Sequence, residues 1–214
     1  MAFKLLNHNI IFIHIPKAGG SSIYNAFKLA NSCILIPTGY AHTSITELEN
    51  NYKINADTYI TQCRHPFKRF YSHYNYLLEW NEKRIKGLLP LKSKPIKYYI
   101  KMNQFLYEKK FIGFVELLND KSKINDFIYN FPTEISAFQK QVDFLNLKRN
   151  LKIFKLENGL IWKYFSELGY KITPMHSKKS VYKNIKINNE IIDILYKYFF
   201  EDYSYFNYDK NLNN

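Results

Sequence analysis

The chain is poor in cysteine. Cys33 and Cys63 are its only two cysteines among 214 residues, and both lie in apolar segments typical of strands. Two cysteines provide neither a disulfide framework nor the ligand spacing of a zinc site. The sequence therefore predicts two buried thiols, no metal site, and a protein that works in a reducing compartment.

Long apolar runs are also missing. The longest, near residues 10–15, is far too short to cross a bilayer, and no signal-peptide pattern precedes it. We therefore expect no transmembrane segment and a soluble, cytoplasmic protein. With 214 residues, 46% of them apolar, the chain can bury one core, so we expect a single domain over residues 1–214.

Acidic residues are outnumbered by basic ones. Lysine and arginine total 31 against 18 for aspartate and glutamate, which gives a net charge of +13. Such a charge attracts nucleic acids, acidic membranes, acidic glycans and multiply phosphorylated small molecules. The chain has no arginine-rich arm, zinc-finger spacing or RNA-binding aromatic motif, which disfavours sequence-specific nucleic-acid binding. A basic nucleic-acid-binding module remains an alternative that accounts for the charge alone.

The chain does have a glycine turn after a strand-like segment. The apolar run at residues 10–15 leads through Pro16 into Lys17-Ala18-Gly19-Gly20-Ser21-Ser22. Glycine permits a tight turn and close approach of the backbone to a ligand. A helix that starts near Ser21 would direct its first amide groups and the positive end of its dipole at an anion over the turn. The lysine precedes the glycines, whereas it follows them in the usual ATP- and GTP-binding loop.

A second strand-to-helix junction follows further along the chain. The strand-like segment 58–64 ends in Arg64, and Pro66 then opens a helix at a position that tolerates proline. Ser72 lies about two turns into this helix, and the helical period places Arg69 near it on the polar side. A fork of guanidinium donors together with a hydroxyl suits a second phosphate.

The order of the elements indicates an α/β fold. Strand-like segments near 9–15, 33–37, 58–63 and 151–156 alternate with helix-like segments near 20–30, 43–51, 66–80, 96–109, 110–118, 158–168 and 188–200. This alternation is typical of a central parallel sheet flanked by helices. Ligands of such sheets bind beyond the carboxyl ends of the strands, where Lys17 and Arg64 both fall.

Together the two junctions resemble the sulfotransferase family that uses 3'-phosphoadenylyl sulfate, and within it the carbohydrate branch similar to heparan sulfate 2-O-sulfotransferase. The family usually carries Thr at the position of Ala18, and Asn or Asp at that of His65. These departures leave Lys17, the glycines, Arg64 and Ser72 in place. The resemblance implies a P-loop-like three-layer sandwich with a central parallel sheet flanked by helices.

The resemblance also implies how the donor is bound. The 5'-phosphosulfate would be held by Lys17, Ala18, Gly19, Gly20, Ser21 and Ser22, and the 3'-phosphate by Arg64 and Ser72. Lys178 and Ser180 lie in a segment similar to the family's loop over the nucleotide. The product would be adenosine 3',5'-bisphosphate, and no metal would be required.

On the acceptor side, the resemblance points to His42 as the base. Histidine has an ordinary pKa of about 6.5, which suits proton abstraction near neutral pH. Glu47 is a rival, because other branches of the family use a carboxylate. Gln139 lies in a segment similar to one that lines the acceptor cleft, and residues 80–150, which match only loosely, are the expected helical acceptor-specificity region.

The predicted reaction is transfer of a sulfuryl group to a hydroxyl of a carbohydrate acceptor. Negative charge then develops on the departing phosphate oxygen, where Lys17 would stabilise it. The alternative enzyme is a P-loop-like nucleotide kinase or hydrolase. Such an enzyme normally holds Mg²⁺ with a carboxylate at the end of a neighbouring strand, whereas that strand here ends in Arg64.

Overall fold

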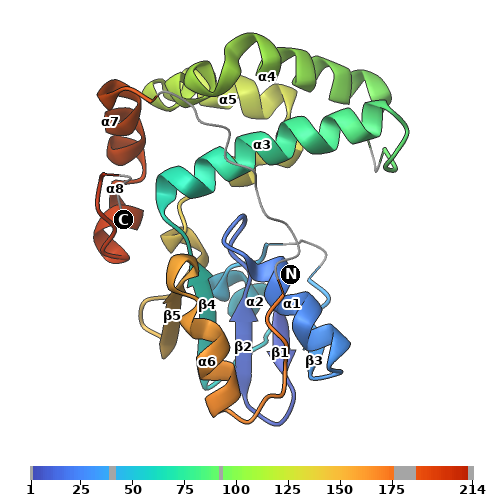
Figure 1. Cartoon of the computed structure of the whole chain (residues 1–214), viewed down its shortest axis with the longest axis vertical. Helices are drawn as coiled ribbons and strands as arrows, with labels where there is room; N and C mark the ends of the chain where they lie inside the picture. Colours follow the sequence, from blue (N-terminus) through green and yellow to red (C-terminus); the bar gives the residue numbers. More distant parts are fainter. Residues whose placement is uncertain (1, 39–41, 92–93, 176–186, 212–214) are drawn as a thin grey trace. The chain divides into compact units, whose positions relative to one another are not determined.

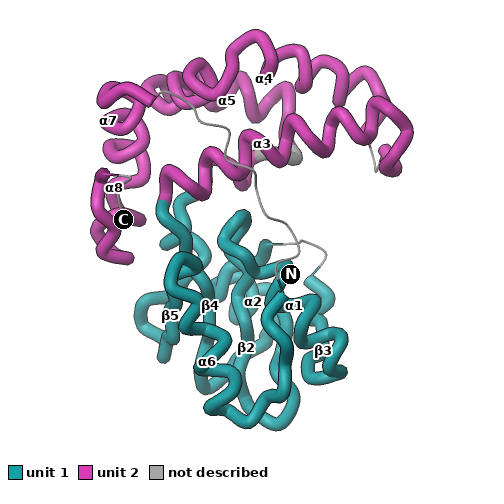
Figure 2. Tube along the Cα trace, in the orientation of Figure 1, with its two compact units in different colours: residues 1–65, 140–179 teal, residues 66–139, 180–214 magenta. Residues whose placement is uncertain are grey.

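The computed structural model describes residues 2–38, 42–91, 94–175 and 187–211. The chain divides into two compact units, which Figure 2 colours separately. The first, called the sheet unit below, consists of Met1–His65 and Lys140–Lys179. The second, the helical unit, consists of Pro66–Gln139 and Ser180–Asn214. Each unit therefore combines segments that are distant in the sequence.

The sheet unit is built on a mixed sheet (Figure 1). In the part of the chain that the structure describes, the sheet has five strands: β1 (Phe3–Leu5), β2 (Ile10–Ile13), β3 (Cys33–Leu35), β4 (Thr58–Cys63) and β5 (Leu151–Lys155), in the spatial order β3-β1-β2-β4-β5. β4 pairs in parallel with both β2 and β5, and the register sets Ile13 opposite Thr61. The carboxyl ends of these strands consequently lie at one edge of the sheet.

One strand departs from the predicted parallel arrangement. β1 is antiparallel to both of its neighbours, β2 and β3. Only residues 6–9 join β1 to β2, and so short a connection makes a hairpin, because a parallel crossover needs about a dozen residues or more. The predicted α/β architecture with helices flanking a sheet is confirmed, but the sheet is mixed rather than parallel.

Alternate residues of β4 face helices on different sides of the sheet. Ile60 belongs to a buried cluster that includes side chains of α1 (Gly20–Leu29) and α6 (Leu160–Glu167). Tyr59 precedes Ile60 and therefore points to the opposite face. Its hydroxyl donates a hydrogen bond of 2.9 Å to Glu49 of α2 (Ile45–Asn51). Helices therefore cover both faces of the sheet.

Glu49 fixes α2 within the sheet unit. Its carboxylate also forms an ion pair with Arg149, with the Arg149 Nε 2.8 Å from Oε1. Burial raises the pKa of Glu49, but hydrogen bonds from Arg149 and Tyr59 and the charge of Arg149 outweigh burial and hold that pKa below its ordinary value. The carboxylate is thus ionised at neutral pH, and it anchors the helix that follows His42.

The helical unit contains α3 (Pro66–Ile85), α4 (Ile96–Glu116), α5 (Lys121–Asn130), α7 (Asn189–Tyr198) and α8 (Phe200–Tyr205). Its core is rich in aromatic side chains. Phe70 of α3 stacks on Phe114 of α4 with ring centroids 4.9 Å apart, and Phe199 packs against Phe70 at 5.7 Å. These contacts join segments from both ends of the unit into one apolar cluster.

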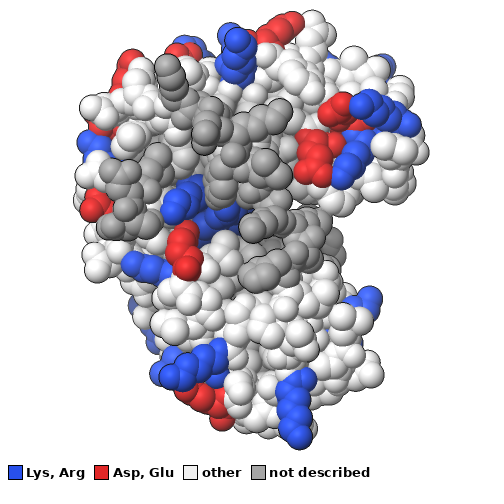
Figure 3. All heavy atoms as spheres, viewed as in Figure 1, with Lys and Arg blue, Asp and Glu red and all other residues white. Residues whose placement is uncertain are grey.

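The helices differ in detail from the sequence prediction. The predicted boundary between helices at 109 and 110 corresponds to a kink inside α4, where Lys110 has a φ of 53°. α5 was not expected, nor was the short strand β1. α3 continues past the predicted end at residue 80, and its last turns carry ion pairs between Glu79 and Lys83 and between Glu82 and Lys86. Figure 3 shows acidic and basic side chains intermixed there.

The two cysteines differ in their burial. Cys63 is buried, Cys33 is half-buried, and neither forms a disulfide bond. The burial expected for both therefore holds for Cys63 only. None of the helices in the described residues is long and apolar enough to cross a membrane.

Candidate active site

Residues 14–19, called the 14–19 loop below, connect β2 to α1 in a tight turn. The Ala18 N–H donates to the Ile15 carbonyl at 3.3 Å. Gly19 has a φ of 85° and Lys17 a φ of 62°, so both occupy the left-handed region. Glycine adopts that region at little cost, whereas a lysine does so only where surrounding structure holds it there. The turn thus imposes an unusual backbone conformation on the candidate catalytic lysine.

The two glycines of this turn pack closely against neighbouring side chains. A Cβ atom on Gly20 would lie 2.2 Å from Cδ2 of His14, which is itself only 7% exposed. A Cβ atom on Gly19 would lie 2.7 Å from Oε1 of Gln62, the penultimate residue of β4. Real Cβ atoms do not approach other atoms so closely, so a larger residue at either position would force the loop or the neighbouring side chain to move.

The described part of the site is basic rather than acidic. α1 begins at Gly20 with no acidic residue in its first turn, and no described side chain caps its Gly19 N-cap. A helix start of this kind leaves its dipole available to an anion. The described residues contain no group of three or more His, Cys, Asp or Glu that could hold a metal ion. The start of α1 therefore suits an anionic ligand.

Arg64 reaches the 14–19 loop from the end of β4. Its Nη1 donates a hydrogen bond of 3.1 Å to the carbonyl of Lys17. Both residues follow parallel neighbouring strands, so this contact agrees with the expectation that they lie at one edge of the sheet. The guanidinium of Arg64 therefore lies against the main chain of Lys17 on the sheet unit.

Two side chains that the sequence did not single out hold the backbone around Arg64. Oε1 of Gln141 accepts from the Arg64 N–H at 2.9 Å, and Nε2 of Gln141 donates to the Arg64 carbonyl at 2.8 Å. Glu157 accepts from the N–H of His65 at 2.9 Å. Sequence reasoning examined the segment that contains Gln141 but selected Gln139 from it. A glutamine has no local signature that reveals which residue it will bind 77 positions away.

His42 also lies beside the 14–19 loop. Its Nδ1 is 3.0 Å from the carbonyl oxygen of His14, and the two imidazole rings meet edge to face with centroids 4.6 Å apart. A carbonyl oxygen can only accept, so Nδ1 of His42 carries the proton in this bond. The neutral ring then keeps its basic lone pair on Nε2. In this tautomer Nε2 is the nitrogen that can accept a proton.

Glu47 serves as a helix cap in the sheet unit. Its Oε2 accepts from the main-chain N–H of Ser44 at 3.0 Å, and the Ser44 hydroxyl accepts from the N–H of Glu47 at 3.2 Å. This reciprocal pair is a capping box at the start of α2. The Ser44 hydroxyl also donates to Oε2, at 3.2 Å. The carboxylate of Glu47 therefore caps the N-terminus of α2.

Other predicted residues belong to the helical unit or lie outside the described residues. Ser72 is buried within α3, and Gln139 is half-buried at the end of its segment of the helical unit. Lys178 and Ser180 lie outside the described residues, as do residues 39–41 before His42.

The expected polar position of Arg69 is wrong. Its side chain is 1% exposed, donates to the carbonyl of Gln139 and lies 5.6 Å from the centre of the Phe199 ring. The helical period places Arg69 opposite the apolar stripe, but a segment from near the C-terminus covers that position with an aromatic ring. A carbonyl and a ring face are among the groups that contact the buried guanidinium.

The comparison with known families agrees with this geometry. The sequence model of the Sulfotransferase family matches residues 6–209, almost the whole chain and parts of both units. The chain therefore belongs to the sulfotransferase family, whose members are transferases that move a sulfuryl group to an acceptor. No curated protein and no solved structure matches the chain significantly.

Proposed function

We propose that this chain transfers a sulfuryl group from 3'-phosphoadenylyl sulfate to a hydroxyl of a carbohydrate, as in the branch similar to heparan sulfate 2-O-sulfotransferase. The observation that supports this most is the hydrogen bond from Arg64 to the carbonyl of Lys17. It brings the Arg64 guanidinium to the main chain of Lys17 at the strand ends, and the proposed donor carries separate anionic groups at its 5' and 3' positions.

The residues of the turn would bind the 5'-phosphosulfate. The left-handed backbone at Lys17 and Gly19 and the uncapped start of α1 fit a ligand that brings its own negative charge. Ala18, Gly20, Ser21 and Ser22 complete this proposed group. Arg64 would hold the 3'-phosphate together with Ser72, and Lys178 and Ser180 would contact the nucleotide. No metal is needed, because the cations are supplied by side chains.

The proposed transfer is an in-line displacement at sulfur. The acceptor oxygen forms a bond to the sulfur atom while the bond from sulfur to the bridging phosphate oxygen breaks. That oxygen keeps the electron pair and leaves on adenosine 3',5'-bisphosphate, and Lys17 stabilises its growing negative charge. The proton of the acceptor hydroxyl passes to Nε2 of His42. The hydrogen bond between Nδ1 of His42 and the carbonyl of His14 keeps the ring in the required tautomer.

Replacing His42 distinguishes it from Glu47 as the base. We expect His42→Ala to lower kcat by roughly 10²–10⁴-fold, the usual contribution of a general base. The acidic limb of the pH–rate profile should disappear as well, because that limb reports protonation of the base. Initial rates measured across the pH range provide both results.

Glu47→Gln is the comparison variant. An amide oxygen can still accept from the Ser44 N–H, so the capping box of α2 is kept. We expect this variant to retain its acidic limb and most of its turnover. The opposite pattern, a lost limb in Glu47→Gln and a normal one in His42→Ala, would assign the base to Glu47.

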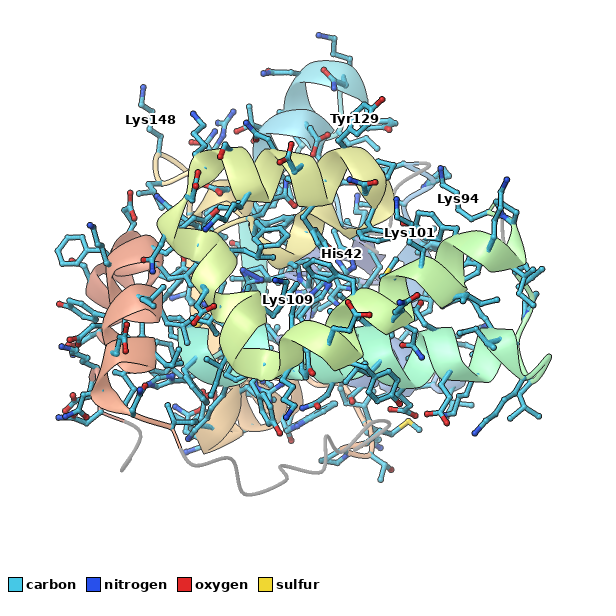
Figure 4. All side chains as sticks on the ribbon, turned by 90° about the horizontal axis from the view of Figure 1, so that it is seen from above. His42, Lys94, Lys101, Lys109, Tyr129 and Lys148 are labelled. Atoms are coloured by element: carbon cyan, nitrogen blue, oxygen red, sulfur yellow. The ribbon has the colours of Figure 1, made fainter. Side chains whose placement is uncertain are left out.

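The acceptor would be recognised in part by the helical region at residues 80–150. This region carries exposed lysines and an exposed aromatic ring, which suit a glycan with acidic groups. Lys101 donates to Asn130 at 2.8 Å, linking α4 to α5, and the neighbouring Tyr129 is 88% exposed. Figure 4 labels Lys101, Lys109 and Tyr129 on these helices. We therefore propose an acidic carbohydrate, with Gln139 among the residues that bind it.

The donor and the reaction can be tested directly with the full chain. Calorimetry should show tighter binding of adenosine 3',5'-bisphosphate than of adenosine 5'-phosphate or ATP with Mg²⁺. Incubation with 3'-phosphoadenylyl sulfate and a panel of acidic and neutral glycans should give a product with the mass gain of one sulfuryl group. Preference for ATP with Mg²⁺ and phosphate transfer would instead support the kinase or hydrolase alternative. Salt-sensitive binding of nucleic acid without nucleotide preference would support a nucleic-acid-binding module.

A further inference from the structure

Gln141 holds the main chain of Arg64 through both ends of its amide. The Gln141 side chain has an exposed fraction of 0%, and it bonds to the Arg64 N–H at 2.9 Å and to the Arg64 carbonyl at 2.8 Å. One side chain thus satisfies both polar main-chain groups of one residue. The Gln141 amide therefore imitates a partner residue on a neighbouring antiparallel strand, which would form the same two bonds.

The hydrogen bonds from Gln141 replace strand pairing just beyond the end of β4. The β4–β5 ladder ends at the pair Cys63–Lys155, so Arg64 is the first residue beyond it. The next N–H, that of His65, donates to Glu157 at 2.9 Å. Pro66 then begins α3 and has no N–H to donate. Side chains, rather than a neighbouring strand, therefore hold the backbone at the turn from strand to helix.

We propose that Gln141 is a positioning residue that aims the Arg64 guanidinium at the 3'-phosphate of the donor. This inference rests on the proposed function. Arginine recognises phosphate through a rigid planar fork, so the strength of the contact depends on the direction from which the side chain arrives. That direction is set by the backbone of Arg64, which Gln141 fixes in the interior.

The Gln141 amide also affects the 14–19 loop indirectly, through the hydrogen bond from Arg64 to the Lys17 carbonyl. Because Arg64 Nη1 donates to that carbonyl at 3.1 Å, a displaced Arg64 backbone also removes a bond from the 14–19 loop. Loss of the phosphate contact is direct, whereas the loop keeps its own turn bond between Ala18 and Ile15. The larger effect of Gln141 is therefore on the 3' end of the donor. Gln141 becomes a determinant of selectivity for a 3'-phosphorylated nucleotide.

Gln141→Met tests this role, because methionine has a similar length and neither donates nor accepts strongly. With the full chain, titration calorimetry should show affinity for adenosine 3',5'-bisphosphate reduced by about tenfold, equivalent to ~1.4 kcal/mol. Affinity for adenosine 5'-phosphate should change by less than about threefold, or ~0.7 kcal/mol. A merely structural role would weaken both ligands alike or neither.

Gln141→Glu is a second variant of nearly the same size. Its carboxylate can still accept from the Arg64 N–H, but it has no hydrogen to donate to the Arg64 carbonyl. We expect the same selective loss, and this variant carries the test if Gln141→Met is unfolded at the assay temperature. Asn81→Leu is the control: Asn81 is 2% exposed in the helical unit and donates to Met102 Sδ. Losing this buried amide should lower thermal stability and leave the ratio of the two affinities unchanged.

The outcomes separate this inference from the proposed function. Wild-type chain that binds both nucleotides equally overturns the function, and the inference with it. Wild-type chain that prefers the bisphosphate, together with folded Gln141 variants that keep this preference, overturns the inference alone. Selective loss in both Gln141 variants, and none in Asn81→Leu, supports it.

Discussion

Lys17→Ala is expected to abolish sulfuryl transfer while the fold is retained. The side chain is half-buried within the 14–19 loop, where its charge would face the departing phosphate oxygen. Removing one preorganised positive group from such a position lowers kcat by roughly 10²–10³-fold or more. Alanine and lysine tolerate the left-handed backbone at this position about equally, so thermal stability should change little. Rates of product formation and circular dichroism melting curves measure the two effects.

Lys53→Ala is the matched control for this prediction. Lys53 is also a lysine with a left-handed backbone, with a φ of 56°, and it belongs to the same unit. It is exposed and lies outside the proposed donor site. The control variant should retain full turnover. Normal turnover by Lys17→Ala, or equal losses in the two variants, would remove Lys17 from the mechanism.

Arg64→Ala is expected to weaken adenosine 3',5'-bisphosphate far more than adenosine 5'-phosphate. A hydrogen bond to a charged group contributes about 1.5–3 kcal/mol, which corresponds to a loss of roughly 10–150-fold for the nucleotide that carries the 3'-phosphate. Adenosine 5'-phosphate has no 3'-phosphate, so its affinity should fall only because the 14–19 loop loses the hydrogen bond from Arg64 to the Lys17 carbonyl. Calorimetry with both nucleotides measures the difference.

Arg149→Ala controls for the loss of any guanidinium from the sheet unit. Arg149 pairs with Glu49, and its side chain is 48% exposed. This change should leave the affinities for both nucleotides unchanged. If Arg64→Ala weakens the two nucleotides equally, Arg64 supports the 14–19 loop and does not bind the 3'-phosphate.

The juxtaposition of Lys17 and Arg64 could be predicted because its causes are local. Each residue follows an apolar segment of strand length, and parallel neighbours deliver their carboxyl ends to one edge. The sequence predicted that both residues lie beyond the carboxyl ends of strands, but it did not predict the hydrogen bond between them. The reversal of β1 was missed because a strand of three residues, Phe3–Leu5, has too little alternation to be recognised.

The partners of Arg64 and Arg69 could not be predicted, because they come from distant segments. Gln141 follows Arg64 by 77 positions, and Phe199 is separated from Arg69 by most of the helical unit. Helical periodicity indicates which side of a helix is apolar, but it does not reveal that a later segment will cover the other side. Such contacts are fixed by tertiary packing alone.

The close approach of Gly20 to His14 has a consequence for how this protein can diverge. A methyl group at position 20 requires that the imidazole at position 14 shrink or move, and that imidazole also supports the ring of His42. Substitutions at 14 and 20 are therefore expected to compensate one another, each harmful alone and tolerated as a pair. Such a pair of substitutions would also remove the ring contact between His14 and His42, the proposed base. Descendants that vary at both positions should therefore have altered acceptor chemistry.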